Sequence, residues 1–105
     1  MKWIALLALV ACQHGNAGAP QIDPLYRADI ETLCDVVHRS GVESMPENER
    51  WPVIAMWLGP HLKTEAAHDF LVRIQPLTGE PKARALDAEA QRVGLAGCAL
   101  SALWR

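Results

Sequence analysis

The chain has 105 residues, half of them hydrophobic, with 10 basic and 12 acidic side chains and a formal net charge of −2 at pH 7. This length accommodates one small domain and excludes a multidomain enzyme. The slightly negative charge excludes a general nucleic-acid-binding surface, which requires a basic stripe or patch.

The first twelve residues have the features of an export signal. Met1 and Lys2 are followed by residues 3–11, all of them apolar, and the apolar run stops at Cys12. A helix that crosses a bilayer needs about 20 apolar residues, whereas the hydrophobic region of a signal peptide is shorter. The pattern therefore predicts a signal-peptide helix and not a membrane-spanning one.

The end of this run, Leu9-Val10-Ala11-Cys12, resembles the lipobox of bacterial lipoproteins. The resemblance implies transfer of a diacylglyceryl group to the sulfur of Cys12 and cleavage before that residue. It also implies acylation of the new amino group with a fatty acid such as palmitate. By the sorting rule of that family, Gln13 after the cysteine implies the outer membrane, on the side that faces the periplasm.

Two other interpretations of the N-terminus remain open. Residues 17–19, Ala-Gly-Ala, have the form of an ordinary secretory cleavage site, although Pro20 would then follow the cut. A buried core helix is the third interpretation of the apolar run, but it leaves the lone Lys2 and the abrupt stop at Cys12 without a reason. The lipoprotein interpretation divides the chain into a signal peptide (1–11), a lipidated flexible tether (12–22) and a helical domain (23–105).

The three cysteines fit this division. Lipidation uses Cys12, which leaves Cys34 and Cys98 as a pair in an oxidising compartment. We expect a Cys34–Cys98 disulfide that stabilises the domain by about 4 kcal/mol, because it closes a long loop. Two free thiols and a redox-active pair are the alternatives, and the absence of a CxxC motif disfavours the second of these.

After the tether, apolar residues recur at helical spacing. Asp23-Pro24 is typical of a helix start and Gly41 of a helix end, which predicts a first helix over 24–40. Its inward stripe is expected to contain Tyr26, Ile30, Leu33, Cys34 and Val37.

The second helix follows a loop over 41–47. Proline is tolerated in the first turn of a helix, so Pro52 places the start near Asn48 or Glu49, and Gly59-Pro60 should end or kink the helix. Because its apolar positions form a broad stripe, we expect this helix to be the most buried. The stripe comprises Trp51, Val53, Ile54, Ala55, Met56, Trp57, Leu58 and Leu62.

Two more helices and a short tail complete the chain. Thr64 is the expected N-cap of the third helix, whose buried face contains Ala67, Phe70, Leu71 and Ile74. The fourth helix is expected over 81–93, with Ala83, Leu86, Ala90 and Val93 inward and Lys82, Arg84, Asp87, Glu89 and Arg92 outward. The tail from Leu95 to Arg105 is expected to be held mainly by the disulfide. The sequence thus predicts a compact all-α bundle of about four short helices joined by one disulfide.

The region from Leu33 to Trp104 also resembles small uncharacterised exported proteins of myxobacteria and related proteobacteria. The matching segments are Cys34-Asp35, Trp57-Leu58, Leu62-Lys63-Thr64 and residues 92–98, Arg-Val-Gly-Leu-Ala-Gly-Cys. This resemblance implies a unit that keeps the two cysteines together, and it implies no activity.

No residue pattern predicts catalysis or a cofactor. The four histidines, His14, His38, His61 and His68, lack metal-ligand spacing and are expected at the surface, with a weak metal site that includes Met56 as the alternative. Cys34 and His38 have a spacing that suits a thiolate nucleophile only if Cys34 is reduced. Of the tryptophans, only Trp104 is expected to be exposed, and Arg84/Asp87 and Glu89/Arg92 are expected to pair along one helix.

These observations predict a membrane-anchored lipoprotein that binds another protein of the cell envelope, without enzymatic activity. A tethered small-ligand or metal-binding protein is the alternative. An exposed apolar patch would favour a protein partner, whereas a pocket with converging ionisable groups would favour a ligand.

Overall fold

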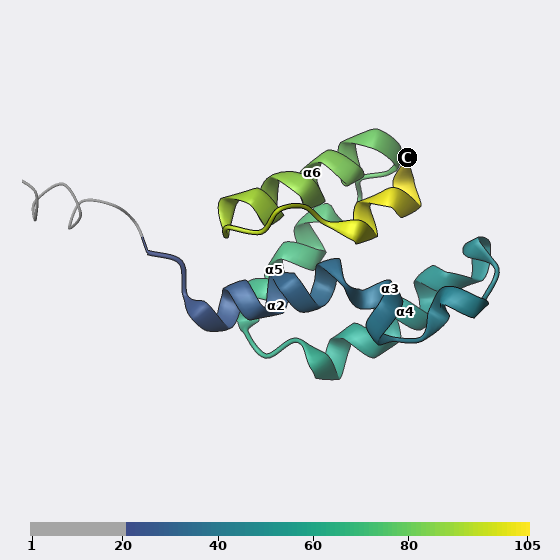
Figure 1. Ribbon diagram of the computed structural model, residues 1–105, viewed down its shortest axis with the longest axis horizontal. Helices are drawn as coiled ribbons and strands as arrows, with labels where there is room; N and C mark the ends of the chain where they lie inside the picture. The colour runs from purple at the N-terminus through teal and green to yellow at the C-terminus, as the bar shows by residue number, and fades with distance from the viewer. Residues whose placement is uncertain (1–20) are drawn as a thin grey trace, which may run out of the picture.

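The computed structural model describes residues 21–105, and every regular element in that range is helical. Figure 1 shows the elements in chain order. They are α2 (Pro24–Cys34), α3 (Val36–Arg39), η1 (Val42–Ser44), α4 (Glu47–His61), α5 (Glu65–Ile74), α6 (Gly79–Arg92) and η2 (Ala99–Trp104). The expected all-α class is therefore confirmed. The expected signal peptide and most of the tether, including Cys12, lie outside the described residues.

The first expected helix is interrupted at Asp35. Asp23 caps α2 by accepting a hydrogen bond from the backbone N–H of Leu25, and Pro24 occupies the first helical position as expected. In α3, Val36 is fully buried, whereas Val37, which was expected to face inward, is only half-buried.

The expectation for the second helix is wrong in its bounds and in its burial. Its start at Glu47 leaves Pro52 in the second turn, and the helix continues through Pro60 to His61. A proline removes one backbone hydrogen bond. The two carbonyls that lose their partner belong to Asn48 and Met56, which are exposed to water. Only Ile54 and Leu58 of α4 are buried, so this helix is not the most buried one.

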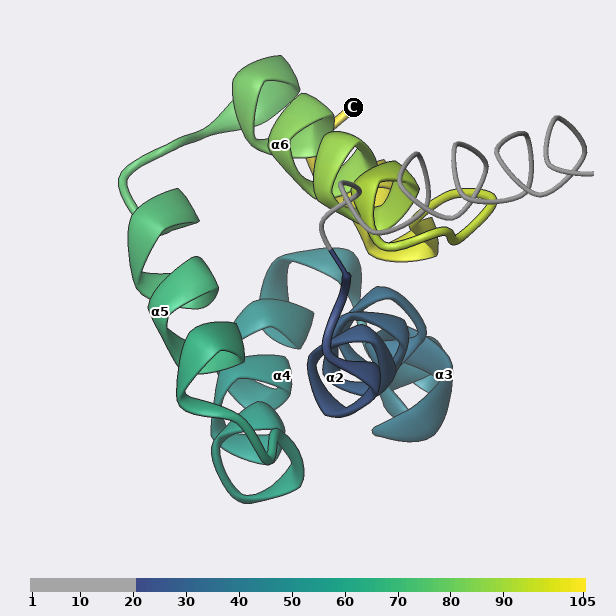
Figure 2. The same ribbon diagram turned by 90° about the vertical axis from the view of Figure 1, so that its left-hand side faces the viewer.

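The central position belongs to α2. It contacts α3, α5, α6 and η2, and its buried residues are Tyr26, Asp29, Ile30, Leu33 and Cys34. Figure 2 shows α5 at the side of the molecule, between α4 and α6. Ile22, within the segment expected to be the tether, is half-buried against this core.

The fourth expected helix begins at Gly79 and not at residue 81, because Pro81 falls in the first turn, where no N–H is required. Its inward residues Ala83, Leu86, Ala90 and Val93 are all buried as expected. Gly94 ends it at φ +90°, and the amides of Gly94 and Leu95 donate to the carbonyls of Gln91 and Ala90. This pairing is a Schellman motif.

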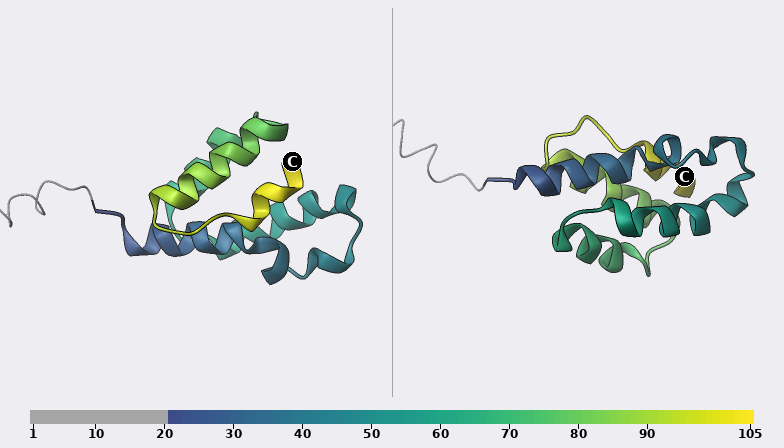
Figure 3. Two further views of the ribbon diagram at one scale, coloured as in Figure 1. Left: turned by 45° about the horizontal axis from the view of Figure 1, so that its top comes forward. Right: turned by 90° about the horizontal axis from the view of Figure 1, so that it is seen from below.

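Cys34 and Cys98 form the expected disulfide, which joins α2 to the start of η2. The disulfide is not the only support of the tail, however. Figure 3 shows η2 beside α6, and η2 also contacts α2 and α3. Leu100 is fully buried, and the Arg105 guanidinium donates to the Asp87 carboxylate at 2.5 Å. The C-terminal segment therefore has its own packing and ion-pair contacts.

Among residues 21–105, no helix combines the length and the apolar composition that crossing a membrane requires.

Candidate functional site

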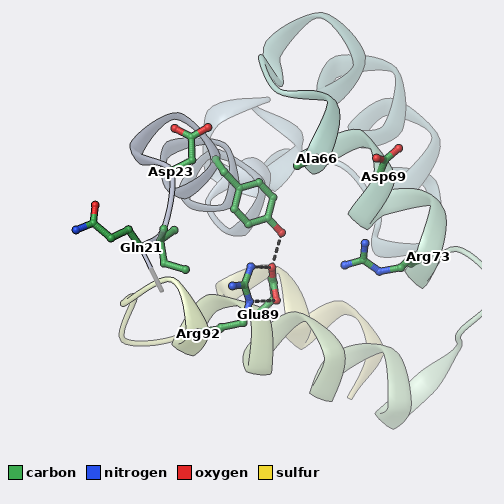
Figure 4. Close-up of a pocket in the computed structure, with 9 residues that line it drawn as sticks. Gln21, Asp23, Ala66, Asp69, Arg73, Glu89 and Arg92 are labelled. Atoms are coloured by element: carbon green, nitrogen blue, oxygen red, sulfur yellow. Dashed lines mark hydrogen bonds and ion pairs between the residues drawn. The ribbon is translucent and has the colours of Figure 1, made fainter. Parts of the chain in front are cut away.

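A hollow of about 470 Å³ lies where the N-terminus of α2 meets α5 and α6. Figure 4 shows its lining. The Tyr26 hydroxyl donates a hydrogen bond to the Glu89 carboxylate, and the Arg92 guanidinium donates to the same carboxylate at 2.9 and 2.6 Å. The Arg73 guanidinium points towards this hollow from α5 and lies 5.5 Å from the ring centre of Phe70.

The three linked side chains in this hollow keep their ordinary protonation states near neutral pH. Burial, together with the hydrogen bond to Glu89, raises the pKa of Tyr26 to about 12. The hydrogen bond from Arg92 lowers the pKa of the Glu89 carboxyl, and the same contact raises the pKa of Arg92. A phenol, a carboxylate and a guanidinium in these states are poor at proton transfer. These side chains join α2 to α6, and they give the hollow a polar lining.

A second arrangement surrounds Lys82, which the sequence places on the wet face of its helix. This expectation is wrong, because Lys82 is only 5% exposed. Its ammonium lies 5.2 Å from the ring centre of Trp51 and 4.7 Å from that of Trp104. The two indoles meet edge to face at 5.2 Å. Burial lowers the pKa of Lys82.

Trp104 is therefore not the exposed aromatic residue that we expected. It is half-buried against the core, with the Trp51 ring at its edge and the Lys82 ammonium over its ring. Trp57 is also half-buried, and its ring stacks on the imidazole of His61 at 3.7 Å.

The outer face of α4, formed by Val53, Met56, Trp57 and Pro60, is the third arrangement. Residues 51–60 include no charged side chain, yet only Ile54 and Leu58 among them are buried. Met56 is 80% exposed and Val53 is 38% exposed. A helix that is apolar on all sides is normally covered on all sides.

The histidines of the described chain do not come together. His38 pairs with Glu43 at 3.2 Å, His61 approaches the Trp57 carbonyl, and the imidazole of His68 lies between the carbonyls of Thr64 and Gly59. Within residues 21–105, no group of three or more candidate ligands is placed to hold a metal ion. His14 lies outside the described residues.

The cysteine chemistry is settled for two of the three residues. Cys34 and Cys98 are joined to each other, so neither is a free thiol, and Cys34 cannot act as a thiolate beside His38. Cys12, the expected lipidation site, lies outside the described residues.

Of the two ion pairs expected along α6, one is confirmed. Glu89 and Arg92 pair, but Asp87 accepts from Arg105 at the C-terminus and not from Arg84. The Arg105 guanidinium lowers the pKa of the Asp87 carboxyl by its hydrogen bond.

Asp29 and Lys82 are two charged residues whose burial sequence reasoning missed. Asp29 is 3% exposed, and its carboxylate accepts hydrogen bonds from the backbone amides of Lys63 and Thr64 and from the Thr64 hydroxyl. A weak signal exists for Asp29, because it lies at helical spacing from Tyr26 and Leu33. Lys82 has the same kind of weak signal, because it lies four residues before Leu86 and eight before Ala90.

Comparison with models of protein families, with curated proteins and with solved structures finds no match to this chain.

Proposed function

We propose that the protein is a small bacterial lipoprotein whose helical domain binds another protein of the cell envelope. A lipid on Cys12 anchors it in the outer membrane, facing the periplasm. The lipobox-like segment from Leu9 to Cys12, at the end of a short apolar run, supports the anchor, and Gln13 supports the outer membrane by analogy. One acyl chain gives marginal attachment, so the two or three chains implied here provide durable attachment.

The Cys34–Cys98 disulfide supports export. Disulfides form and persist in oxidising compartments and are rare in the reducing cytosol. With this pair joined, Cys12 is the remaining cysteine of the chain. Lipidation requires a thiol at the end of the signal segment, and Cys12 stands at that position.

The observation that carries the protein-binding proposal is the outer face of α4. Met56 and Val53 expose large apolar side chains, and Trp57 and Pro60 extend the same face by further helical turns. Clustered exposed apolar side chains on a soluble domain mark interaction surfaces. An aromatic and a methionine side chain are typical of interface cores.

The charges around this face indicate the charge of the partner surface. The N-terminal turn of α4 carries Glu47 and Glu49, both exposed, and the basic residue that follows them, Arg50, donates to the carbonyls of Met45 and Glu43. Helices that lie on anionic membranes carry Lys and Arg on their polar face. The complement of the α4 face is therefore an apolar protein surface with basic residues at one end, and not a lipid surface.

A photo-crosslinking amino acid tests this assignment in cells that make the full chain. We expect a discrete protein adduct when the crosslinker replaces Met56, and none when it replaces Arg84, an exposed residue of α6 that serves as the matched control. The adduct should map to an apolar surface flanked by basic residues, and Val53→Asp should abolish it.

Three results would contradict the proposal. They are adducts of phospholipid at Met56, adducts between two copies of this chain, and equal adducts from Met56 and Arg84.

The anchor has its own test. Replacement of residues 1–12 by a cleavable secretory signal should release a chain that starts at Gln13. We expect the wild-type chain in the detergent phase of a two-phase extraction and the released chain in the aqueous phase. Retention of the released chain in the membrane would show that attachment does not require the lipid.

A further inference from the structure

Lys82 is a buried cation without an anionic partner in the described chain. Lys82 is only 5% exposed, and it belongs to none of the ion pairs among residues 21–105. The acidic residues of α6 nearest to it in sequence are occupied elsewhere, because Glu80 and Asp87 both pair with Arg105. The indole rings of Trp51 and Trp104 both lie within 5.2 Å of its ammonium.

The backbone position of Lys82 increases this imbalance. Lys82 follows the first turn of α6, which begins at Gly79. The N-terminal end of a helix carries partial positive charge, which stabilises anions and disfavours cations. An anion at the ammonium of Lys82 would therefore be favoured by both the side chain and the helix.

The ammonium-bearing side chain of Lys82 lines a hollow between α4, α5 and α6 of about 180 Å³. Its walls are largely apolar and include Trp51, Ala55, Leu71 and Val72, with the Gln75 amide at the edge. A second hollow of about 170 Å³ shares Lys82 as a wall and is also lined by Glu47, Trp51 and Trp104, although Glu47 forms no ion pair with Lys82. An apolar cavity of about 150 Å³ is large enough for a benzene ring.

We propose that the hollow between α4, α5 and α6 binds a small carboxylate with an apolar group the size of one ring. The carboxylate pairs with the Lys82 ammonium, and the apolar group packs against Trp51, Leu71 and Val72. This site does not depend on the proposed docking face of α4. It would make the protein a binder of small organic acids in addition to, or instead of, a protein partner.

Phenylacetate is the probe, with 2-phenylethanol as a neutral ligand that carries the same ring. We follow the indole N–H resonances of the chain purified from cells in a non-ionic detergent. Phenylacetate should shift the Trp51 resonance saturably, while Trp57, which stacks on His61 away from the hollow, serves as an internal control. The alcohol should bind about tenfold more weakly, a difference of about 1.4 kcal/mol.

Lys82→Met retains an apolar stem and removes the charge, and Arg84→Met removes an exposed charge from the same helix as the matched control. We expect Lys82→Met to weaken phenylacetate binding about tenfold and Arg84→Met to leave it unchanged. Two results would overturn the site: no saturable Trp51 shift up to about 10 mM phenylacetate, or equal affinity for acid and alcohol. The second comparison uses the wild-type chain, so it decides the matter even if Lys82→Met fails to fold.

Discussion

At the scale of single residues, the Tyr26 hydroxyl provides the polar contact between α2 and α6. It donates to Glu89, which also accepts from Arg92, and the Arg92 guanidinium lies 5.7 Å from the ring centre of Tyr26. Because the neutral phenol donates this bond, loss of its proton would place a negative charge beside the Glu89 carboxylate.

Tyr26 should therefore titrate far above free tyrosine. It is the only tyrosine of the chain, so tyrosinate absorbance reports this residue alone. We expect a midpoint of about 12 in the folded protein, against 10.0 for an unperturbed tyrosine, and a midpoint between these values in Glu89→Gln. Since the folded pKa is the higher one, the stabilisation is complete below pH 10 and is lost as the pH rises towards 12. A folded protein that titrates like free tyrosine would contradict the contact.

Residue-scale features divide clearly into predictable and unpredictable ones. Tyr26, Leu86 and Ala90 could be placed inward because each continues an apolar helical stripe. Lys82 could not, because its burial depends on Trp51 and Trp104, which lie far away in sequence and meet only in the folded chain. Burial of a polar residue depends on its partners, and a single helical period contains no information about them.

At the scale of elements, Asp29 fixes the start of α5. Its carboxylate accepts from the Thr64 hydroxyl and amide at 2.7 Å each, and the Thr64 oxygen in turn accepts from the Ala67 amide at 3.2 Å. The sequence predicts Thr64 as the N-cap. It does not show that a residue of α2 holds the cap in place, because the two segments are more than 30 positions apart.

Asp29→Asn should destabilise the domain by about 2 kcal/mol. An amide has one acceptor oxygen instead of two, and its NH₂ group would face the buried N–H and O–H groups that donate to the carboxylate in the wild type. Thr64→Ser, which retains the hydroxyl, should cost far less than Thr64→Ala, which should cost about 1 kcal/mol or more. Urea unfolding followed by circular dichroism measures all three. Equal stability of Asp29→Asn and wild type would remove Asp29 from this role.

Helix α4 shows why the burial of the second expected helix could not be predicted from the sequence. Its apolar residues occupy both faces, and periodicity alone cannot distinguish a helix buried on all sides from one with an exposed apolar face. The core of this small domain covers Ile54 and Leu58 but leaves Met56 at the surface.

The two faces of α4 should respond differently to substitution. Met56→Asp should change the free energy of unfolding by no more than about 0.5 kcal/mol, since the side chain has few contacts. Ile54→Ala, in the same helix but fully buried, should cost about 2–4 kcal/mol. Thermal unfolding of the two variants gives the comparison, and a large loss in Met56→Asp would mean that the outer face is covered within the chain.

At the scale of the whole molecule, one disulfide and several weaker contacts hold the C-terminal segment to the bundle. The all-α class, the pairing of Cys34 with Cys98 and the ends at Gly41 and Gly94 were predictable, because each follows from local residue chemistry or from cysteine parity. The contacts of η2 with α6 were not, because they depend on Leu100 and Arg105 meeting distant partners.

The double variant Cys34→Ala/Cys98→Ala should lose about 4 kcal/mol in unfolding free energy, because the disulfide links residues 64 positions apart. It should nevertheless retain its helical circular dichroism in the absence of denaturant, since Leu100 and the Arg105 ion pairs remain. Loss of helix without denaturant would mean that the tail depends on the disulfide alone.

The most direct test of the account is the intact mass of the chain extracted from its native membrane, with and without reductant. We expect a chain of residues 12–105 that carries a diacylglyceryl group and an amide-linked acyl chain, and a gain of two hydrogens on reduction. An unmodified chain that begins at another residue, such as Pro20, would contradict lipid anchoring through Cys12 and with it the proposed place of the protein in the cell.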